Sequence, residues 1–254
     1  FAYSNTNYLF LEKIVEHVTG DTYSNVLNQF YDDQGLSNVE INRENQNLPA
    51  YFATNKTASS DVSQWVENYG YDGGIYTTAN ELNRFLEKLF ISKDILSESS
   101  LTKMQEWIPM MPLEIPIGEG KIFEYGYGVM KLEYNEKSYI GHSGGTLKYQ
   151  SFLFYNQNSD TIISLLTNSS GRYYNNAFFQ ELIPAILAKL WYLRTRAMQP
   201  EAQTDSKASG PPGRQTVIPN TEILRRCLNW EKRMVVIQSA LIAQWNWRRY
   251  GIVN

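Results

Sequence analysis

Three short motifs carry the side chains best suited to chemistry. Tyr3-Ser4-Asn5 stands at the start of the chain, residues 73–78 read Gly-Gly-Ile-Tyr-Thr-Thr, and residues 141–146 read Gly-His-Ser-Gly-Gly-Thr. A phenol and an imidazole can exchange protons, and a serine hydroxyl can attack a carbonyl group once a base accepts its proton. The order and spacing of the three motifs are more informative than any one of them.

Each motif also has an ordinary structural interpretation. Tyr3-Ser4-Asn5 before a helix is a typical capping segment, and Gly73-Gly74 is a turn. Gly144-Gly145 fits a bulge or a corner in a strand. His142 and Ser143 cannot form a nucleophile–base pair, because neighbouring residues of a strand point to opposite faces of the sheet.

The elements that must position these motifs begin with helices. Apolar residues recur every three or four positions in the first half of the chain, which predicts amphipathic helices. Gly20 is a natural end for the first helix, and Thr77 or Thr78 is a natural cap for the third. An Asn-rich stretch up to about residue 64 predicts loops and short strands. The predicted helices lie at residues 6–19, 21–31, 79–90 and 97–107.

The second half has the pattern of an antiparallel sheet. Prolines and glycines in residues 108–120 predict an irregular connection. About four strands rich in Tyr, Ile, Val, Phe and Leu follow, with hairpin turns predicted at Asn135-Glu136 and Asn156–Asp160. A last amphipathic helix over residues 175–193, which Pro184 can kink, is expected to cover one face of the sheet. The predicted fold class is α+β, an antiparallel sheet packed by helices together with a helical subdomain.

Taken together and in this order, the motifs resemble those of the penicillin-recognising serine hydrolases. This β-lactamase-related family includes class C β-lactamases, D-alanyl-D-alanine carboxypeptidases, penicillin-binding proteins and related esterases. Tyr-x-Asn at residues 3–5 precedes a helix whose sequence LEKIVEHVTG, at 11–20, has the family's texture. Residues 73–78 match the family's Gly-Gly-x-x-Ser/Thr-Thr segment, and residues 142–144 stand where the family has Lys-Thr-Gly or His-x-Gly. The resemblance covers roughly residues 1–190.

The resemblance implies a serine hydrolase that works through a covalent acyl-enzyme and needs no cofactor. Its substrate would be a D-Ala-D-Ala-like peptide, a β-lactam or an ester. Tyr3 would act as the base or the leaving-group acid, and nearby cations would have to lower its pKa from about 10. Asn5 would hold a substrate amide, because its side chain has both a donor and an acceptor. These two residues and His142 are the implied catalytic residues.

The glycine-flanked strand would bind the substrate. His142 would attract a substrate carboxylate or assist proton transfer, and Ser143 would donate a hydrogen bond to that carboxylate. Gly144 completes the motif, and Gly145 would contribute its backbone N–H to the oxyanion hole. We therefore expect Tyr3 and His142 to face one cleft from opposite walls.

One part of the family pattern is missing. The nucleophile and its lysine partner belong to a Ser-x-x-Lys helix ahead of Tyr-x-Asn, and only two residues precede Tyr3. Ser100-Leu101-Thr102-Lys103 matches formally, but it follows Tyr-x-Asn, so a polar helix start is the simpler interpretation. We therefore interpret the chain as the C-terminal part of a hydrolase that lacks its nucleophile. The resemblance places the whole protein outside the cytoplasm, although this chain shows no signal sequence.

The charge distribution divides the chain in two. Residues 1–193 carry 13 Lys and Arg against 22 Asp and Glu, a net charge of −9. Residues 194–254 carry 10 against 4, a net charge of +6. An acidic body argues against nucleic acid as a partner. We assign residues 1–193 to a partial hydrolase domain, with a mainly helical part at 1–107 and the sheet and last helix at 121–193.

Residues 194–254 do not belong to the family pattern. Residues 199–219 have the composition of a disordered linker, and the sequence after them can be drawn as a helix. This tail would suit a basic appendage that touches a membrane or a partner, and a frameshifted or fused reading frame explains it equally well. Cys227 is the only cysteine, which excludes an intrachain disulfide and a cysteine-based metal site. Two histidines are too few for a histidine-rich metal centre.

Two other functions stay open at this point. The chain could be a non-catalytic module that keeps the peptide-binding groove, in which case ligand binding would survive Tyr3→Phe. It could also be an unrelated α+β interaction protein, in which case Tyr3 and His142 would lie far apart.

Overall fold

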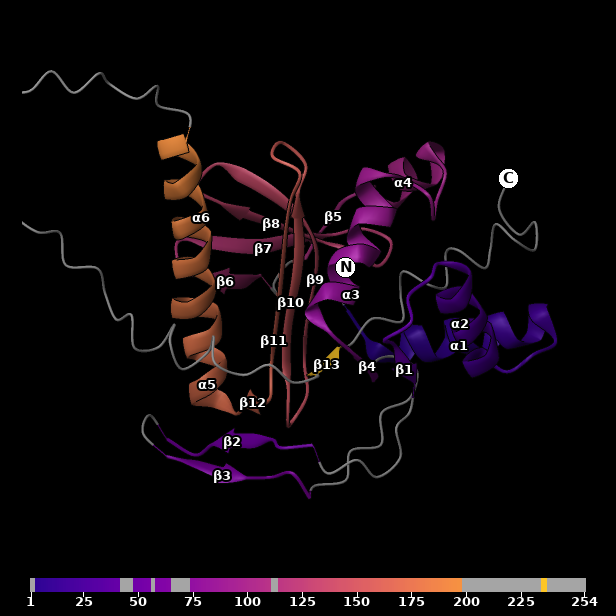
Figure 1. Cartoon of the computed structure of the whole chain (residues 1–254), viewed down its shortest axis with the longest axis horizontal. Helices are drawn as coiled ribbons and strands as arrows, with labels where there is room; N and C mark the ends of the chain where they lie inside the picture. Colours follow the sequence, from indigo (N-terminus) through magenta and orange to yellow (C-terminus); the bar gives the residue numbers. More distant parts are fainter. Residues whose placement is uncertain are drawn as a thin grey trace, which may run out of the picture.

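The computed structural model describes residues 3–41, 48–55, 58–64, 74–110, 114–197 and 234–236, the last three and residues 191–197 as backbone only. A central antiparallel sheet separates two sets of helices (Figure 1). Helix α6 (Ile183–Ala197) lies along one face, and α3 (Ala79–Leu86) lies on the other. The fold is therefore α+β, as the sequence predicted.

Local capping explains the two N-terminal helices. Helix α1 (Asn5–Thr19) begins at Ser4, whose hydroxyl accepts a hydrogen bond from the backbone N–H two residues later at 3.3 Å. It ends at Gly20, whose φ of 70° lies in the left-handed region that glycine adopts without strain. Thr22 caps α2 (Tyr23–Asp33) in the same way. The two helices predicted for this segment are confirmed.

The remaining helices of the helical part also start at hydroxyl caps. Thr78 accepts the backbone N–H of Glu81 at 3.2 Å and starts α3, which a π-helical turn, η1 (Glu87–Ile91), extends. Ser97 caps α4 (Glu98–Met104). Both helices confirm the predictions made from periodicity and capping.

The central sheet has the order β11-β10-β9-β8-β7-β5, and β6 pairs with β7 from outside this row. The hairpin between β8 and β9 turns at Asn135 and Glu136, whose φ angles of 48° and 58° suit a tight hairpin turn. The sequence predicted about four strands, and the described sheet has seven. The strands are β5 (Ile108–Pro109), β6 (Ile115–Ile117), β7 (Gly120–Tyr125), β8 (Met130–Tyr134), β9 (Lys137–Gly145), β10 (Gln150–Asn156) and β11 (Thr161–Thr167).

Residues 108–120 correct one prediction. The sequence indicated an irregular connection there, whereas both β5 and β6 pair antiparallel with β7. A proline can occupy such a short strand when its missing N–H is not needed by the ladder, and each of these strands contains one.

Two apolar cores lie on opposite faces of the sheet. Phe152 and Phe154 of β10 pack toward Phe178 and α6, whereas Leu153 between them packs toward α3 and α2. This alternation follows from the two-residue period of a strand. The last helix begins earlier than predicted, as α5 (Arg172–Ala177) and a π-helical turn, η2 (Phe178–Leu182), before Pro184 in α6.

Two small sheets complete the described fold. Strands β2 (Tyr51–Ala53), β3 (Ser59–Asp61) and β12 (Ser169–Ser170) form one, and β1 (Glu40–Ile41), β4 (Ile75–Thr77) and β13 (Met234–Val236) form the other. The helix drawn for the tail is wrong at β13, where two β-branched valines favour the extended pairing with β4. The rest of that prediction, and the linker at 199–219, lie outside the described residues.

The sheet centre leaves no room for a side chain at Gly141. A Cβ there would lie 2.7 Å from the Cα of Phe154 and against the carbonyl oxygen of Leu153. We expect Gly141→Ala to lower the free energy of unfolding by about 1–3 kcal/mol, because β9 and β10 must separate. Urea unfolding followed by circular dichroism measures this, and Glu133→Ala on exposed β8 surface is expected to stay within about 0.5 kcal/mol of the original. Equal midpoints for both variants would contradict the close packing.

Candidate functional site

Tyr3 and His142, which are far apart in the sequence, lie side by side. Tyr3 precedes α1 and His142 stands in β9, yet their ring centroids are 6.2 Å apart. The Tyr3 ring also lies 5.6 Å from that of Tyr8 in α1 and 5.5 Å from that of Tyr125 at the end of β7. The sheet and the first helix therefore meet in a cluster of four rings that can donate or accept protons.

Hydrogen bonds connect three of these rings in one direction. His142 Nδ1 is 2.6 Å from the carbonyl oxygen of Ser143, which can only accept, so Nδ1 carries the proton. In a neutral imidazole, Nε2 is then an acceptor, and the Tyr125 hydroxyl 3.1 Å away donates to it. The Tyr125 oxygen in turn accepts from the hydroxyl of Tyr8. The result is a one-way chain from Tyr8 through Tyr125 to His142.

Burial keeps this chain uncharged at neutral pH. It lowers the pKa of His142 from 6.5 to about 4, against the opposing effect of the hydrogen bond to Ser143. Burial also raises the pKa values of Tyr8 and Tyr125, so both phenols stay protonated donors. In this state the Nε2 of His142 accepts its hydrogen bond from Tyr125.

The Tyr3-Ser4-Asn5 motif serves as a helix cap and also brings Tyr3 to the ring cluster. Ser4 is the helix cap of the ordinary interpretation, and its capping bond fixes the chain entering α1. This entry turns Tyr3 toward the ring cluster and leaves Asn5 exposed in the first turn. An exposed amide beside Tyr3 is available to a ligand.

The glycine-flanked end of β9 divides into a buried and an exposed part. Ser143 is buried, and its hydroxyl lies 3.6 Å from the sulfur of Met130. Gly144 is half-buried and Gly145 is exposed, where the strand leaves the sheet. A Cβ on Gly145 would lie 2.8 Å from the side-chain amide of Gln150, so glycine lets that amide lie over the strand.

Sequence reasoning missed three residues that shape this site, namely Tyr8, Tyr125 and Gln150. The signal for Tyr125 was the run Tyr125-Gly126-Tyr127-Gly128. A Cβ on Gly126 would meet the backbone of Met104, so the glycine allows the turn that aims Tyr125 inward. Tyr8 gives no signal of its own, because an apolar helix position explains it equally well.

The other motifs lie apart from the ring cluster. In the Gly-Gly-Ile-Tyr-Thr-Thr motif at residues 73–78, the described part begins at Gly74 and forms β4 and the cap of α3. Gly73 lies outside the described residues. Ser100 bonds through its hydroxyl to that of Ser97 at 2.9 Å, and Lys103 is exposed, which supports a polar helix start.

Neither a metal cluster nor a membrane span occurs in the part of the chain that the structure describes. No three His, Cys, Asp or Glu side chains gather there to hold a metal ion. None of the helices described is both long enough and apolar enough to cross a bilayer.

Comparison with known proteins identifies relatives of this arrangement. A sequence model of the family described as "Beta-lactamase" matches residues 1–183. No curated protein gives a significant sequence match. Among solved structures, D-amino acid amidase from Ochrobactrum anthropi SV3, complexed with L-phenylalanine amide, superposes with a TM-score of 0.64 at 20% identity. That superposition covers 76% of this chain and 58% of the amidase, so the chain spans less than two thirds of that structure's length.

Two further structures share the fold. A D-stereospecific amidohydrolase from Streptomyces sp. has a TM-score of 0.53 at 22% identity, covering 66% of this chain and 50% of its own. The octameric penicillin-binding protein homologue from Pyrococcus abyssi has a TM-score of 0.59 at 23% identity, covering 74% and 43%. At these identities the likeness establishes the fold alone.

The pKa of His142 predicts a pH-dependent stability. Between its ordinary value of 6.5 and about 4, the unfolded chain binds a proton at this residue that the folded chain does not. Stability from this group is therefore complete above pH 6.5 and declines as the pH falls toward 4, by up to about 3 kcal/mol. Urea unfolding at pH 7 and pH 4.5 measures the loss. We expect His142→Gln to flatten the decline and exposed His17→Gln to leave it unchanged; equal slopes in all three proteins would show that His142 is not responsible.

Proposed function

Because the chain belongs to the β-lactamase family, we propose that it contributes the tyrosine–histidine side of a serine hydrolase active site. The proposed reaction is acyl transfer from an amide or ester through a covalent acyl-enzyme. The observation that carries the proposal is the 6.2 Å between the ring centroids of Tyr3 and His142, which brings two distant motifs of the family together. Family membership also removes the interpretation as an unrelated interaction protein.

Tyr3 is the proposed proton-transfer residue. In this role its phenol takes the proton of the attacking hydroxyl and returns it to the leaving group. Asn5 is the proposed contact for a substrate amide, because it stands exposed two residues along at the start of α1. The exposed backbone of Gly145, with Gly144 before it, is the proposed substrate-binding and oxyanion-stabilising edge.

His142 acts in this proposal through Tyr125 and the packing of Tyr3. As a neutral acceptor it orients the Tyr125 hydroxyl, and Tyr8 orients the same hydroxyl from the other side. The Tyr3 ring packs against this fixed group, so its phenol is held in one place. Preorganisation of this kind lowers the cost of reaching the reactive geometry.

The proposed substrates are small molecules or peptides with a reactive carbonyl, namely D-Ala-D-Ala-like peptides, β-lactams or esters. The names of two structural neighbours, an amidase and an amidohydrolase of D-configured substrates, support amide cleavage within this class. Nucleic acid is not a proposed partner, because residues 1–193 are acidic. An extracytoplasmic location of the whole protein is part of the proposal, as is membrane contact of the basic tail at 194–254.

None of the three serines considered above is the proposed nucleophile. Ser143 faces Met130, Ser4 caps a helix, and Ser100 bonds to Ser97, so none of the three is placed as the partner of Tyr3. We therefore assign residues 1–193 to a partial hydrolase domain that depends on a Ser-x-x-Lys helix from outside this sequence.

The first test uses this chain alone. Incubation with a β-lactam or an activated ester is expected to leave its mass unchanged, because the serine and lysine of the acylation step are missing. Intact-protein mass spectrometry checks this. A stoichiometric acyl adduct would refute the missing-nucleophile proposal, and noncovalent binding that survives Tyr3→Phe would favour the non-catalytic module instead.

The second test uses a longer product of the same coding sequence that includes a Ser-x-x-Lys helix. There we expect Tyr3→Phe to lower kcat/KM about 10²- to 10⁴-fold, since it removes the proton-transfer group. Tyr125→Phe is expected to shift the pH profile of the rate, because it removes the donor to His142. Exposed Tyr173→Phe in α5 is the matched control and should keep full activity. Undiminished activity of the Tyr3 variant would overturn its proposed role.

A further inference from the structure

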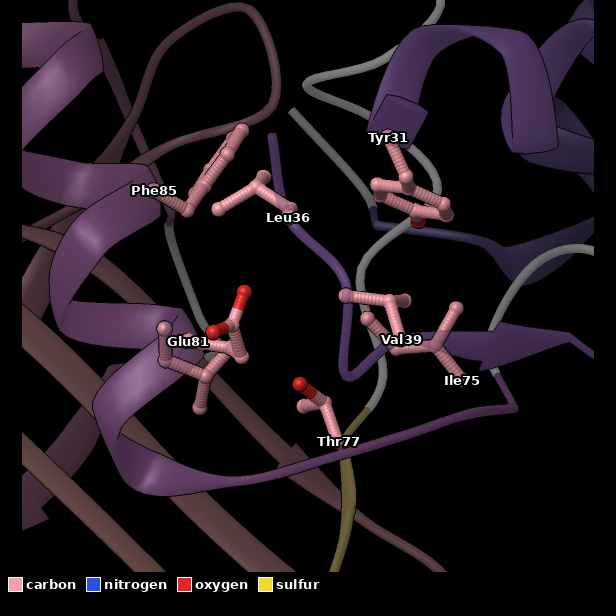
Figure 2. Close-up of a pocket in the computed structure, with 8 residues that line it drawn as sticks. Tyr31, Leu36, Val39, Ile75, Thr77, Glu81 and Phe85 are labelled. Atoms are coloured by element: carbon pink, nitrogen blue, oxygen red, sulfur yellow. The ribbon is translucent and has the colours of Figure 1, made fainter. Parts of the chain in front are cut away.

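A small cavity lies within the helical part, apart from the ring cluster. It is lined by α2, the chain after it, β4 and α3, and its volume is about 20 Å³. Apolar side chains such as Leu36, Ile75 and Phe85 form most of its wall. Figure 2 shows the Glu81 carboxylate and the Thr77 hydroxyl pointing into one space, with Tyr31 across from them.

Three polar atoms on this wall lack a protein partner. They are the hydroxyls of Tyr31 and Thr77 and the Oε2 of Glu81. The three side chains are only 4%, 3% and 5% exposed, in the same order. A buried polar atom without a hydrogen bond costs about 1–3 kcal/mol, so three around one cavity point to a common ligand.

The charge of Glu81 limits what that ligand can be. Its Oε1 accepts from Arg84 at 2.9 Å, and Arg84 also donates to the carbonyl oxygen of Gly35 at 3.0 Å. The carboxylate is therefore already paired with a cation on its outer side. A charged ligand in the cavity would remain uncompensated among apolar walls, whereas a neutral donor satisfies Oε2 at no such cost.

We propose that the cavity is a binding site for one or two internal water molecules that bridge Tyr31, Thr77 and Glu81. A cavity holds a water when it offers at least about 10–15 Å³ and two to four polar partners, and this one offers both. Water donates to the carboxylate oxygen and exchanges hydrogen bonds with the two hydroxyls.

The water site ties three separate elements together. Tyr31 belongs to α2, Thr77 ends β4, and Glu81 stands in the first turn of α3. Thr77 also belongs to the Gly-Gly-Ile-Tyr-Thr-Thr motif, which the ring cluster leaves without a role. The two threonines of the motif have different roles at this junction. Thr78 caps α3 through its hydroxyl, and Thr77 binds the water.

The test counts long-lived internal waters by magnetic relaxation dispersion of water nuclei. Thr77→Val removes one partner at nearly constant shape, and Tyr31→Phe removes another. We expect each variant to lose signal equivalent to one or two waters and to raise the unfolding equilibrium constant about 5- to 100-fold. The controls Thr102→Val and Tyr173→Phe lie on exposed surfaces and should change neither quantity.

A double-mutant cycle and a crystal structure complete the test. The two hydroxyls act through shared water, so the combined variant should cost less than the sum of the single variants. If Thr77→Val does not fold, Tyr31→Phe alone decides the water count. An unchanged count in the Tyr31 variant, or a crystal structure with a dry cavity or a ligand other than water, would overturn the proposal.

Discussion

The position of β9 in the middle of the sheet is the constraint on which the rest of the site depends. Hydrogen bonds to β8 and β10 fix its register, and Gly141 lets β10 approach within the space that a side chain would fill. This register places His142 opposite Leu153, where its ring meets those of Tyr3 and Tyr125. A shift of one residue would turn the imidazole to the opposite face of the sheet and bring Ser143 into its place.

Burial then determines the chemistry of the site. The same packing that fixes His142 withholds water from it, and a desolvated imidazole is neutral at physiological pH. Its two nitrogens are consequently used in a directed hydrogen-bond chain instead of as a positive charge. Tyr3 lies against this chain as the remaining phenol, which is why the tyrosine and not the histidine is the proposed proton carrier.

At the β4–α3 junction of the helical part, in contrast, buried polar groups do not all have protein hydrogen-bond partners. There a carboxylate and two hydroxyls are buried with an incomplete set of protein partners at the wall of a small cavity. Arg84 balances the charge from outside, so the junction can be both polar and buried. Two neighbouring threonines thus serve a helix cap and a cavity with the same functional group.

The sequence by itself determined the features that rest on local interactions. Hydroxyl caps at Ser4 and Thr78, a glycine stop after α1 and tight hairpin turns act within a few residues, so their elements could be predicted. The motifs also indicated the family and brought Tyr3 and His142 into one hypothesis. Only the tertiary structure decided which side chains surround them, because the hydroxyl of Tyr8 meets that of Tyr125 across 117 residues of chain. Burial of His142, and with it the loss of its charge, likewise arises from packing between distant segments, which no local pattern encodes.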